Sequence, residues 1–128
     1  MSITKHTFVL SIGSNTGDKI KNVENAVKWL AKLLDNTTSS NIYETPEIHG
    51  KYATYMNAVV SGETDLEYED VLGLTKEFEI ENGRTKEGRE RGFVPIDIDI
   101  VIYDENVVRP LDFVKSFFQI GFNLIRKG

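Results

Sequence analysis

The chain has 128 residues, of which 40% are hydrophobic and 27% charged, a composition typical of one globular domain over residues 1–128. A net charge of −5 argues against a general nucleic-acid binder, and no apolar run is long enough to cross a membrane. The N-terminus lacks the apolar core of a secretion signal, and the chain has no cysteine. We therefore expect a cytoplasmic protein without a nucleic-acid or membrane partner, and we also expect a monomer or weak homo-oligomer.

The first half of the chain predicts one amphipathic helix among three strands. In order, the predicted elements are a strand at 7–12, a helix at about 18–35, and strands at 39–43 and 55–62. A turn-rich loop at 13–18 precedes the helix, and Thr16 or Asp18 is expected to cap it. Proline and glycine make the segment 44–51 an irregular loop.

An asparagine interrupts the otherwise apolar strand at 55–62. Alternate side chains of a strand share a face, so Asn57 is expected on the same face as Tyr55 and Val59. A strand amide can form paired hydrogen bonds with the edge of a flat heterocycle, which favours a binding role. The alternative is an edge-strand amide that faces water, and this strand alone is compatible with both.

The second half opens with a helix and a strongly basic segment. A helix is expected over about 64–82, with Gly83 after its last turn and with glutamates such as Glu79 on its solvated surface. Four cations then follow in a chain of net negative charge, namely Arg84, Lys86, Arg89 and Arg91. Cations beside a metal site are what a polyphosphate requires. A solvated charged loop is the other interpretation.

The stretch 93–103 predicts a strand with two aspartates on one face. Asp97 and Asp99 alternate with four isoleucines, which are expected to face the core. Such aspartates have Cα atoms about 6.5–7 Å apart. Aspartate is a poor strand former, and two like charges at this distance repel each other. A divalent cation would offset the repulsion, and Mg²⁺ prefers carboxylate oxygen. A solvated face with two incidental acids is the alternative.

The remaining residues predict a short strand at 107–108 and a short helix at 112–118, and they leave 120–128 undecided. The order β-α-β-β-α-β matches a ferredoxin-like α+β sandwich, in which an antiparallel sheet carries its helices on one face. The other face is then available to a ligand. Asn57, Asp97 and Asp99 are expected to point toward it.

Five short segments of the chain follow one another in a distinctive order. They are Leu10-Ser-Ile-Gly-Ser-Asn15, Tyr43-Glu-Thr-Pro46, Tyr55-Met-Asn-Ala-Val-Val60, Glu79 with Gly83-Arg84, and Pro95-Ile-Asp-Ile-Asp-Ile-Val101. In order and spacing they resemble 6-hydroxymethyl-7,8-dihydropterin pyrophosphokinases, enzymes of the folate pathway. The resemblance extends over roughly residues 8–110.

The resemblance implies a reaction and a set of site residues. Asp97 and Asp99 would hold two Mg²⁺ ions between the phosphates of ATP, the pterin hydroxymethyl oxygen would attack the β-phosphorus, and AMP would leave. On the pterin side, the residues implied are Asn57, Thr45, Pro46 and Tyr55. On the nucleotide side, they are Glu79, Arg84, Lys86 and Arg89. The catalytic residues implied are Asp97, Asp99, Arg84 and Arg91.

The chain also departs from the family pattern. Val94 stands where the family has an arginine, and Arg91 where it has a tryptophan. The family continues beyond this chain with a histidine and an aromatic, so the chain resembles a C-terminally shortened member. Arg91 is one candidate to replace the lost arginine charge. The candidates to replace the aromatic are Phe117, Phe118 and Phe122.

Two other functions are consistent with parts of the sequence. A catalytically impaired paralogue would keep the fold and bind a pterin or a nucleotide without turnover. The Asp-Ile-Asp motif also occurs as the metal motif of glycosyltransferases, but those enzymes need a larger nucleotide-binding domain than 128 residues offer.

Overall fold

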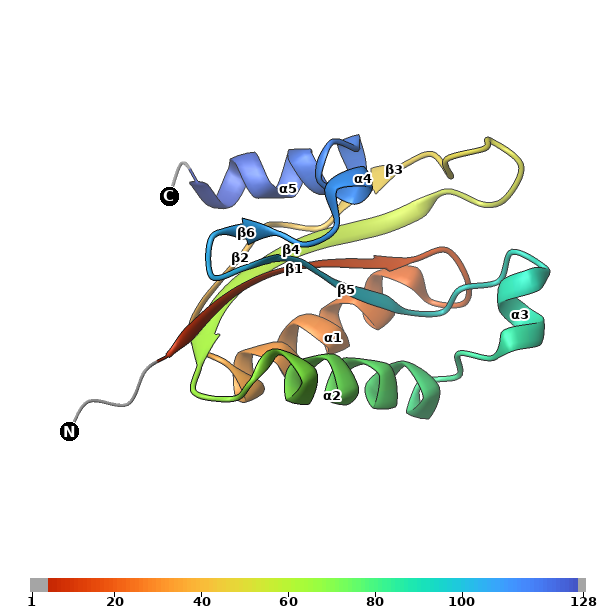
Figure 1. The fold of residues 1–128 in the computed structure, drawn as a ribbon. Coiled ribbons are helices and arrows are strands. Elements are labelled where there is room, and N and C mark those ends of the chain that lie inside the picture. The colour runs from red at the N-terminus through yellow and green to blue at the C-terminus, as the bar shows by residue number, and fades with distance from the viewer. Residues whose placement is uncertain (1–4, 127–128) are drawn as a thin grey trace.

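Six strands form one antiparallel sheet in the computed structural model, which describes residues 5–126 (Figure 1). The strands are β1 His6–Ser14, β2 Asp35–Ser39, β3 Tyr43–Thr45, β4 Tyr55–Thr64, β5 Asp97–Tyr103 and β6 Asn106–Val107. The helices are α1 Lys19–Leu33, α2 Tyr68–Glu81, α3 Lys86–Glu90, α4 Pro110–Phe113 and α5 Ser116–Arg126. The strand order is β2-β4-β1-β5-β6, and β3 also pairs with β4.

The expected α+β ferredoxin-like fold is confirmed, with one addition. Helices α1 and α2 lie together on one face of the sheet, as predicted (Figure 1). Helix α5 lies on the opposite face, against β4. The second face is therefore only partly open. No helix within residues 5–126 is both long enough and apolar enough to span a bilayer.

The main core lies between the sheet and the two long helices. From β5, Ile96, Ile98 and Ile100 enter it and are at most 1% exposed. Ile102 was predicted to join them, but it packs on the opposite face, near α5. The reason is a register shift, since Leu10 of β1 pairs with Ile100 while its neighbour Val9 pairs with Ile102. Beyond this β-bulge, the alternation of β5 side chains between the two faces of the sheet is shifted by one residue.

Several element bounds differ from the predictions. The strand expected at 39–43 is two short strands, β2 and β3, that both pair with β4. The basic segment 84–92 contains the five-residue helix α3, capped by the Thr85 side chain. The strand expected from residue 93 begins at Asp97, because Val94 instead bonds to Asn15 through both its N–H and its carbonyl.

The C-terminal helix is fixed to the sheet by one tyrosine. The Tyr43 hydroxyl donates a hydrogen bond to the Phe117 carbonyl at 2.5 Å and accepts one from the Gly121 N–H at 3.1 Å. A Cβ at Gly121 would lie 2.6 Å from both that hydroxyl and Val59. A larger residue at 121 would therefore push α5 off the sheet. Burial raises the pKa of Tyr43 to about 12, so it stays protonated as a donor.

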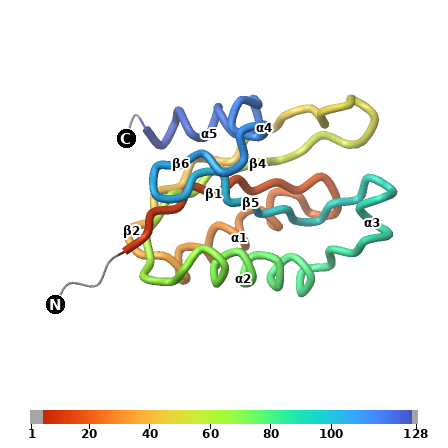
Figure 2. Tube along the Cα trace, in the orientation of Figure 1, coloured from red at the N-terminus to blue at the C-terminus, as the bar shows by residue number. Residues whose placement is uncertain are grey.

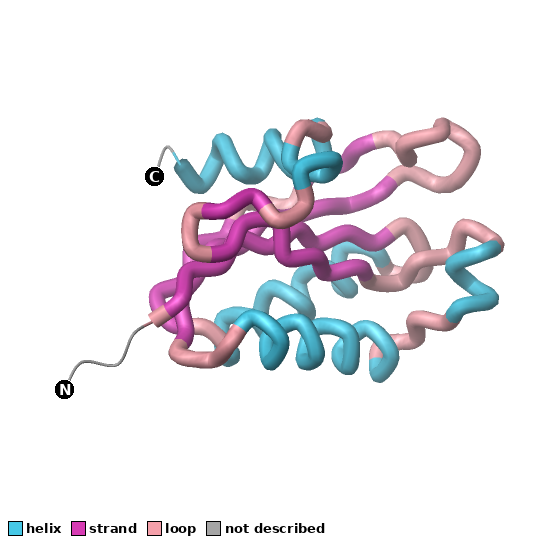
Figure 3. Tube along the Cα trace, in the orientation of Figure 1, coloured by secondary structure: helices cyan, strands magenta, loops and turns pink. Residues whose placement is uncertain are grey.

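Two loops meet at the end of the sheet where β5 begins. They are the loop 46–54 and the segment 82–96 (Figures 2 and 3). Gly92, at φ +81°, touches the Tyr52 ring so closely that a Cβ there would lie 2.3 Å from it. The contact requires a glycine at this position. It joins the loop that follows β3 to the basic segment.

Candidate active site

A row of paired residues crosses three neighbouring strands on the open part of the sheet. Asn57 of β4 pairs with Gly13 of β1, and Gly13 pairs with Asp97 of β5. Their side chains share the face away from α1 and α2. Gly13 has no side chain, so the middle of the row is low, and a cavity of about 190 Å³ lies above it. That volume is below the about 300–1,000 Å³ of sites for drug-sized ligands, and it suits a small ring compound.

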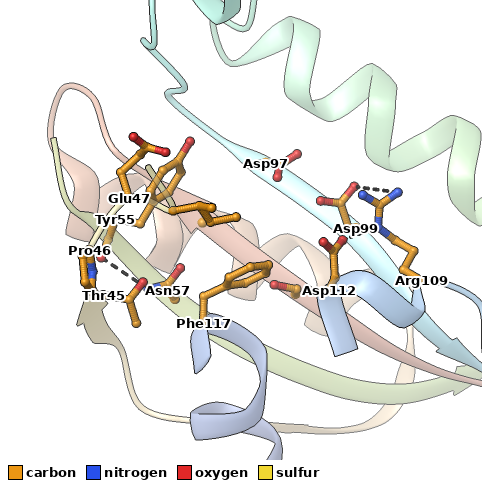
Figure 4. A pocket seen from close by; sticks show the side chains of 13 residues that line it. Thr45, Pro46, Glu47, Tyr55, Asn57, Asp97, Asp99, Arg109, Asp112 and Phe117 are labelled. Carbon is orange, nitrogen blue, oxygen red and sulfur yellow. Dashed lines mark hydrogen bonds and ion pairs between the residues drawn. The ribbon is translucent and has the colours of Figure 1, made fainter. Parts of the chain in front are cut away.

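The cavity has one end lined mainly by uncharged side chains, with Glu47 beside Tyr55, and one end where charged side chains gather (Figure 4). At the uncharged end its lining residues are Gly13, Thr45, Pro46, Ile48, Tyr55, Asn57 and Phe117. Toward the charged end and the rim they are Ser11, Glu47, Asp97, Asp99, Arg109 and Asp112. The structure therefore brings all six predicted pterin and metal residues to one cavity.

Asn57 is held rigidly at the uncharged end. It is 2% exposed, and its Nδ2 donates to Thr45 Oγ1 at 2.8 Å and to the Tyr43 carbonyl at 3.2 Å. Within residues 5–126 no protein group donates a hydrogen bond to Asn57 Oδ1. This oxygen is left to accept a hydrogen bond from the edge of a ligand. Asn57 therefore does not face bulk water, as the alternative interpretation required.

The two strand aspartates lie on one face, each with a cation behind it. Arg84 Nη1 is 2.6 Å from Asp97 Oδ1 and also donates to the Ile96 carbonyl at 3.1 Å. Lys76 Nζ is 3.4 Å from Asp99 Oδ1. The Asp97 side chain is 35% exposed and that of Asp99 17%, so both carboxylates keep access to the cavity.

Glu79 plays a different part from the one predicted. It is not on a solvated helix surface but 4% exposed, and its Oε2 accepts a hydrogen bond from the Ile98 N–H at 2.6 Å. Lys76 donates to the Ile98 carbonyl at 3.1 Å. Two side chains of α2 thus satisfy the backbone of β5 where no strand lies beside it. Burial raises the pKa of Glu79, against the lowering effect of the Ile98 N–H.

The two carboxyl groups lie so close together that it is unfavourable for both to be ionised at once. Burial and the neighbouring Asp97 charge raise the pKa of Asp99 to about 7. Burial acts on Asp97 as well, but hydrogen bonds from Asp99 and Arg84 outweigh it and lower the Asp97 pKa. A divalent cation placed between the two would relieve this repulsion.

The donor set fits magnesium in its substrate-bridging form. Within residues 5–126, no cluster of three or more acidic, histidine or cysteine side chains forms a ready-made metal cage. Mg²⁺ does not need one, because it is commonly held by one or two carboxylates plus water and substrate phosphates. Asp97 and Asp99 are the residues that would hold it.

Three cavity residues come from the C-terminal part, and two of them, Arg109 and Asp112, were not predicted. They are Arg109, at the start of α4, Asp112 within it, and Phe117 of α5, which was one of three candidates for an aromatic cover. Phe118 and Phe122 pack elsewhere, in the cluster under α5. The Arg109–Asp112 spacing of three residues next to Pro110 was a weak sequence signal.

The basic segment lies outside the cavity. Lys86, Arg89 and Arg91 are exposed and do not line it. Arg91 lies 3.6 Å from Glu87 and covers the Phe93 ring. The segment is anchored at its end by Asn15, whose Nδ2 donates to the Gly92 carbonyl. Of the four predicted cations, only Arg84 contacts a metal-site carboxylate among the described residues.

Comparison with known proteins identifies a family for this chain. A family model described as 7,8-dihydro-6-hydroxymethylpterin-pyrophosphokinase (HPPK) matches residues 9–124. The chain is 36% identical over 100 residues to the 2-amino-4-hydroxy-6-hydroxymethyldihydropteridine pyrophosphokinase of Porphyromonas gingivalis, covering 73% of this chain and 67% of that protein. It is 34% identical over 104 residues to the protein of the same name from Aquifex aeolicus, covering 80% of this chain and 64% of that one.

Longer relatives match over the same region. The chain is 30% identical over 107 residues to a "Folate synthesis bifunctional protein" of Arabidopsis thaliana, covering 82% of this chain but 22% of that protein. The chain thus spans about a fifth of the length of this relative and about two thirds of the bacterial ones. The family model nevertheless covers most of the sequence, and the chain belongs to the 7,8-dihydro-6-hydroxymethylpterin-pyrophosphokinase family.

Proposed function

We propose that the protein transfers a diphosphoryl group from ATP to 6-hydroxymethyl-7,8-dihydropterin in folate biosynthesis. The hydroxymethyl oxygen forms a bond to the β-phosphorus as the bond between that phosphorus and the α–β bridging oxygen breaks. AMP leaves, and the hydroxymethyl proton is lost. The products are AMP and the pterin diphosphate.

The observation that carries this proposal is that one cavity joins a heterocycle end to a carboxylate end. Asn57 and Asp97 are separated only by Gly13 in the cross-strand row. A flat pterin whose edge donates a hydrogen bond to Asn57 Oδ1 would direct its hydroxymethyl group across Gly13 toward the carboxylates. Transfer between phosphates needs in-line positioning and charge neutralisation more than covalent help from the protein.

The cavity residues divide the work between the two substrates. Asn57 Oδ1 accepts a hydrogen bond from the pterin edge, Thr45 fixes the Asn57 amide, and Pro46 and Tyr55 line the ring. Asp97 and Asp99 are the residues that would hold two Mg²⁺ ions, and the ions would supply neutralisation of phosphate charge. With four carboxylates in its lining, at Glu47, Asp97, Asp99 and Asp112, the cavity would repel a polyphosphate that came without cations.

The residues assigned to the nucleotide side lie behind the two aspartates or outside the cavity near its charged end. Arg84 is a catalytic residue that steadies Asp97, and Glu79 holds the backbone between the two aspartates. Lys86, Arg89 and Arg91 supply positive charge at the rim for the phosphates. We also propose that the protein acts in the cytoplasm, as a monomer or weak homo-oligomer, without nucleic acid as a partner. The absence of cysteine and the net charge of −5 support this.

A phosphorus NMR time course tests the reaction. Protein, ATP, Mg²⁺ and the hydroxymethylpterin should give AMP and a pterin diphosphate. Asp97→Ala should slow this at least about a hundredfold, since even outer-shell partners of metal ligands are worth about 10- to 100-fold. It should leave the protein folded, because it removes a charge that Asp99 repels.

Glu24→Ala is the matched control, since it removes an exposed carboxylate from α1 on the other side of the sheet. It should turn over like the wild type. A folded wild type that binds pterin or ATP without forming AMP would contradict the proposed function and favour a binding protein with the same fold.

A further inference from the structure

One arginine from the C-terminal part faces the charged end of the cavity. Arg109 is the only cationic side chain among the described residues that line the cavity, against four carboxylates. It immediately precedes α4, and its guanidinium points toward Asp99 (Figure 4). The sequence resemblance assigned it no role. Its position is at the point where a polyphosphate would meet the metal-site aspartates.

One hydrogen bond orients the Arg109 guanidinium, and its other N–H groups remain available to a ligand. Its Nε donates to Asp112 Oδ2, three residues later on the first turn of α4. Its Nη1 lies 4.0 Å from Asp99 Oδ1, which is too long for a hydrogen bond. The side chain is 48% exposed. The Nη groups are therefore aimed at the carboxylate pair while still free to donate to a ligand.

The other cations nearby are committed or distant. Arg84 is 16% exposed and uses its Nη1 on Asp97 and on the Ile96 carbonyl. Lys76 is held from behind by Glu79, Asp99 and the Ile98 carbonyl. Neither lines the cavity.

We propose that Arg109 binds the transferred diphosphoryl group of the nucleotide, and that Asp112 is its positioning residue. The planar guanidinium donates two N–H groups to non-bridging phosphate oxygens, a geometry that arginine provides and lysine does not. The inference rests on the proposed function, because it needs a nucleotide whose β- and γ-phosphates lie beside Asp99.

Equilibrium binding measurements distinguish a contact with the β- and γ-phosphates from a general effect of Arg109 on nucleotide affinity. Calorimetry with Mg²⁺ would compare the non-hydrolysable analogue α,β-methylene-ATP with AMP. Arg109→Ala should weaken the analogue about tenfold to a hundredfold, the usual effect of losing a charge-assisted hydrogen bond, and AMP less than about threefold. Arg109→Lys should recover only part of the loss. Affinity for the pterin should not change.

Lys115→Ala is the matched control, because it removes an exposed cation between α4 and α5 that does not line the cavity. It should bind both nucleotides like the wild type. Asp112→Asn should weaken the analogue less than Arg109→Ala does, and it should add nothing in the Arg109→Ala background. Independent, additive losses would show that Asp112 does not act through Arg109.

The two proposals can fail separately. Normal AMP formation by the wild type, with Arg109→Ala no weaker for the analogue than Lys115→Ala, would overturn the inference and leave the function intact. Loss of analogue binding in Arg109→Ala, with a wild type that forms no pterin diphosphate, would overturn the function and keep the arginine as a phosphate ligand. A wild type with no affinity for the analogue would overturn both.

Discussion

The two faces of the sheet are built from the same strands but by opposite rules. On the face toward α1 and α2, β5 contributes Ile96, Ile98 and Ile100, all nearly inaccessible to water. On the other face the intervening residues are Asp97 and Asp99, which strand propensities disfavour. The face toward α1 and α2 follows the requirements of packing, whereas the part of the other face that α5 leaves open carries charged and polar groups.

The difference shows how the fold supports its site. Residues on the packed face determine where the strands lie, so those on the cavity face are free to be poor strand formers. Gly13, Asn57 and Asp97 adjoin one another across three strands without disrupting them. We therefore expect substitutions on one face to change stability and substitutions on the other to change binding, with little exchange between the two.

The largest expected effect is on the packed face. Ile98→Ala should lower the free energy of unfolding by about 2–5 kcal/mol, because it leaves a cavity in the main core. Urea unfolding measures the change, and the fraction that remains folded should keep its nucleotide affinity. Ile98→Val, expected to cost about 0.5–1.5 kcal/mol, serves if the alanine variant does not fold. If Ile98→Val lowered the free energy of unfolding by much less than that and also weakened nucleotide binding, the two faces would not have separate effects.

A smaller effect is expected on the cavity face. A Cβ at Gly13 would lie 3.2 Å from Tyr55 Cδ2 and 3.4 Å from Asn57 Oδ1. Gly13→Ala should therefore fill the floor and weaken pterin binding about tenfold to a hundredfold, as overpacking by about 1–3 kcal/mol would. Calorimetric titration with the pterin measures this change.

Gly73→Ala is its control, since a Cβ there would meet nothing within 4 Å. It should stabilise α2 by about 0.5–1 kcal/mol without altering pterin affinity. Unchanged pterin binding in Gly13→Ala would mean that the ligand does not lie over this row.

The smallest effect is expected at the far end of the sheet, away from both the core and the cavity. His6 Nδ1 donates a hydrogen bond to Asp104 Oδ2 at 2.6 Å, which raises the pKa of His6, and the Glu67 charge adds to this rise. A raised folded-state pKa stabilises the protein fully below the unfolded value of 6.5, and this contribution is lost as pH rises through the folded value.

Wild type and His6→Gln should therefore differ more in stability at about pH 5.5 than at about pH 8.5, as measured by urea midpoints. The difference should be small, because ion pairs near the surface contribute little. Nucleotide affinity should change equally little in the variant. A larger difference at the higher pH would contradict the assigned His6–Asp104 pair.

The packed face and the pair of aspartates on the other face were predictable from short-range patterns. Period-two alternation identified β5 with its aspartates, and three- and four-residue spacing identified α1. The bulge beside Val9 was not predictable, since a register shift depends on the partner strand. It places Ile102 on the face opposite to the one that alternation predicts.

The parts of the site that escaped prediction depend on long-range contacts. The burial of Glu79 follows from its bond to Ile98, nineteen positions along the chain, which helix periodicity does not reveal. Phe117 reaches the cavity because Tyr43 fixes α5, a contact between residues 74 positions apart. Resemblance placed Glu79 and Asn57 among the predicted site residues, but it gave no role to Arg109, which no matched segment contains.

The α2 side chains that bond to the β5 backbone also affect whether a strand from another chain can pair with β5. Over Asp97–Ile100 the strand has a neighbour on one side only, since β6 pairs with it at Ile102 and Tyr103. An unpaired edge of this kind is a template for a strand from another chain. Glu79 and Lys76 occupy the Ile98 N–H and carbonyl that such a strand would need. The carboxylates thus stay open to small ligands beside an edge whose Ile98 backbone groups are already bonded.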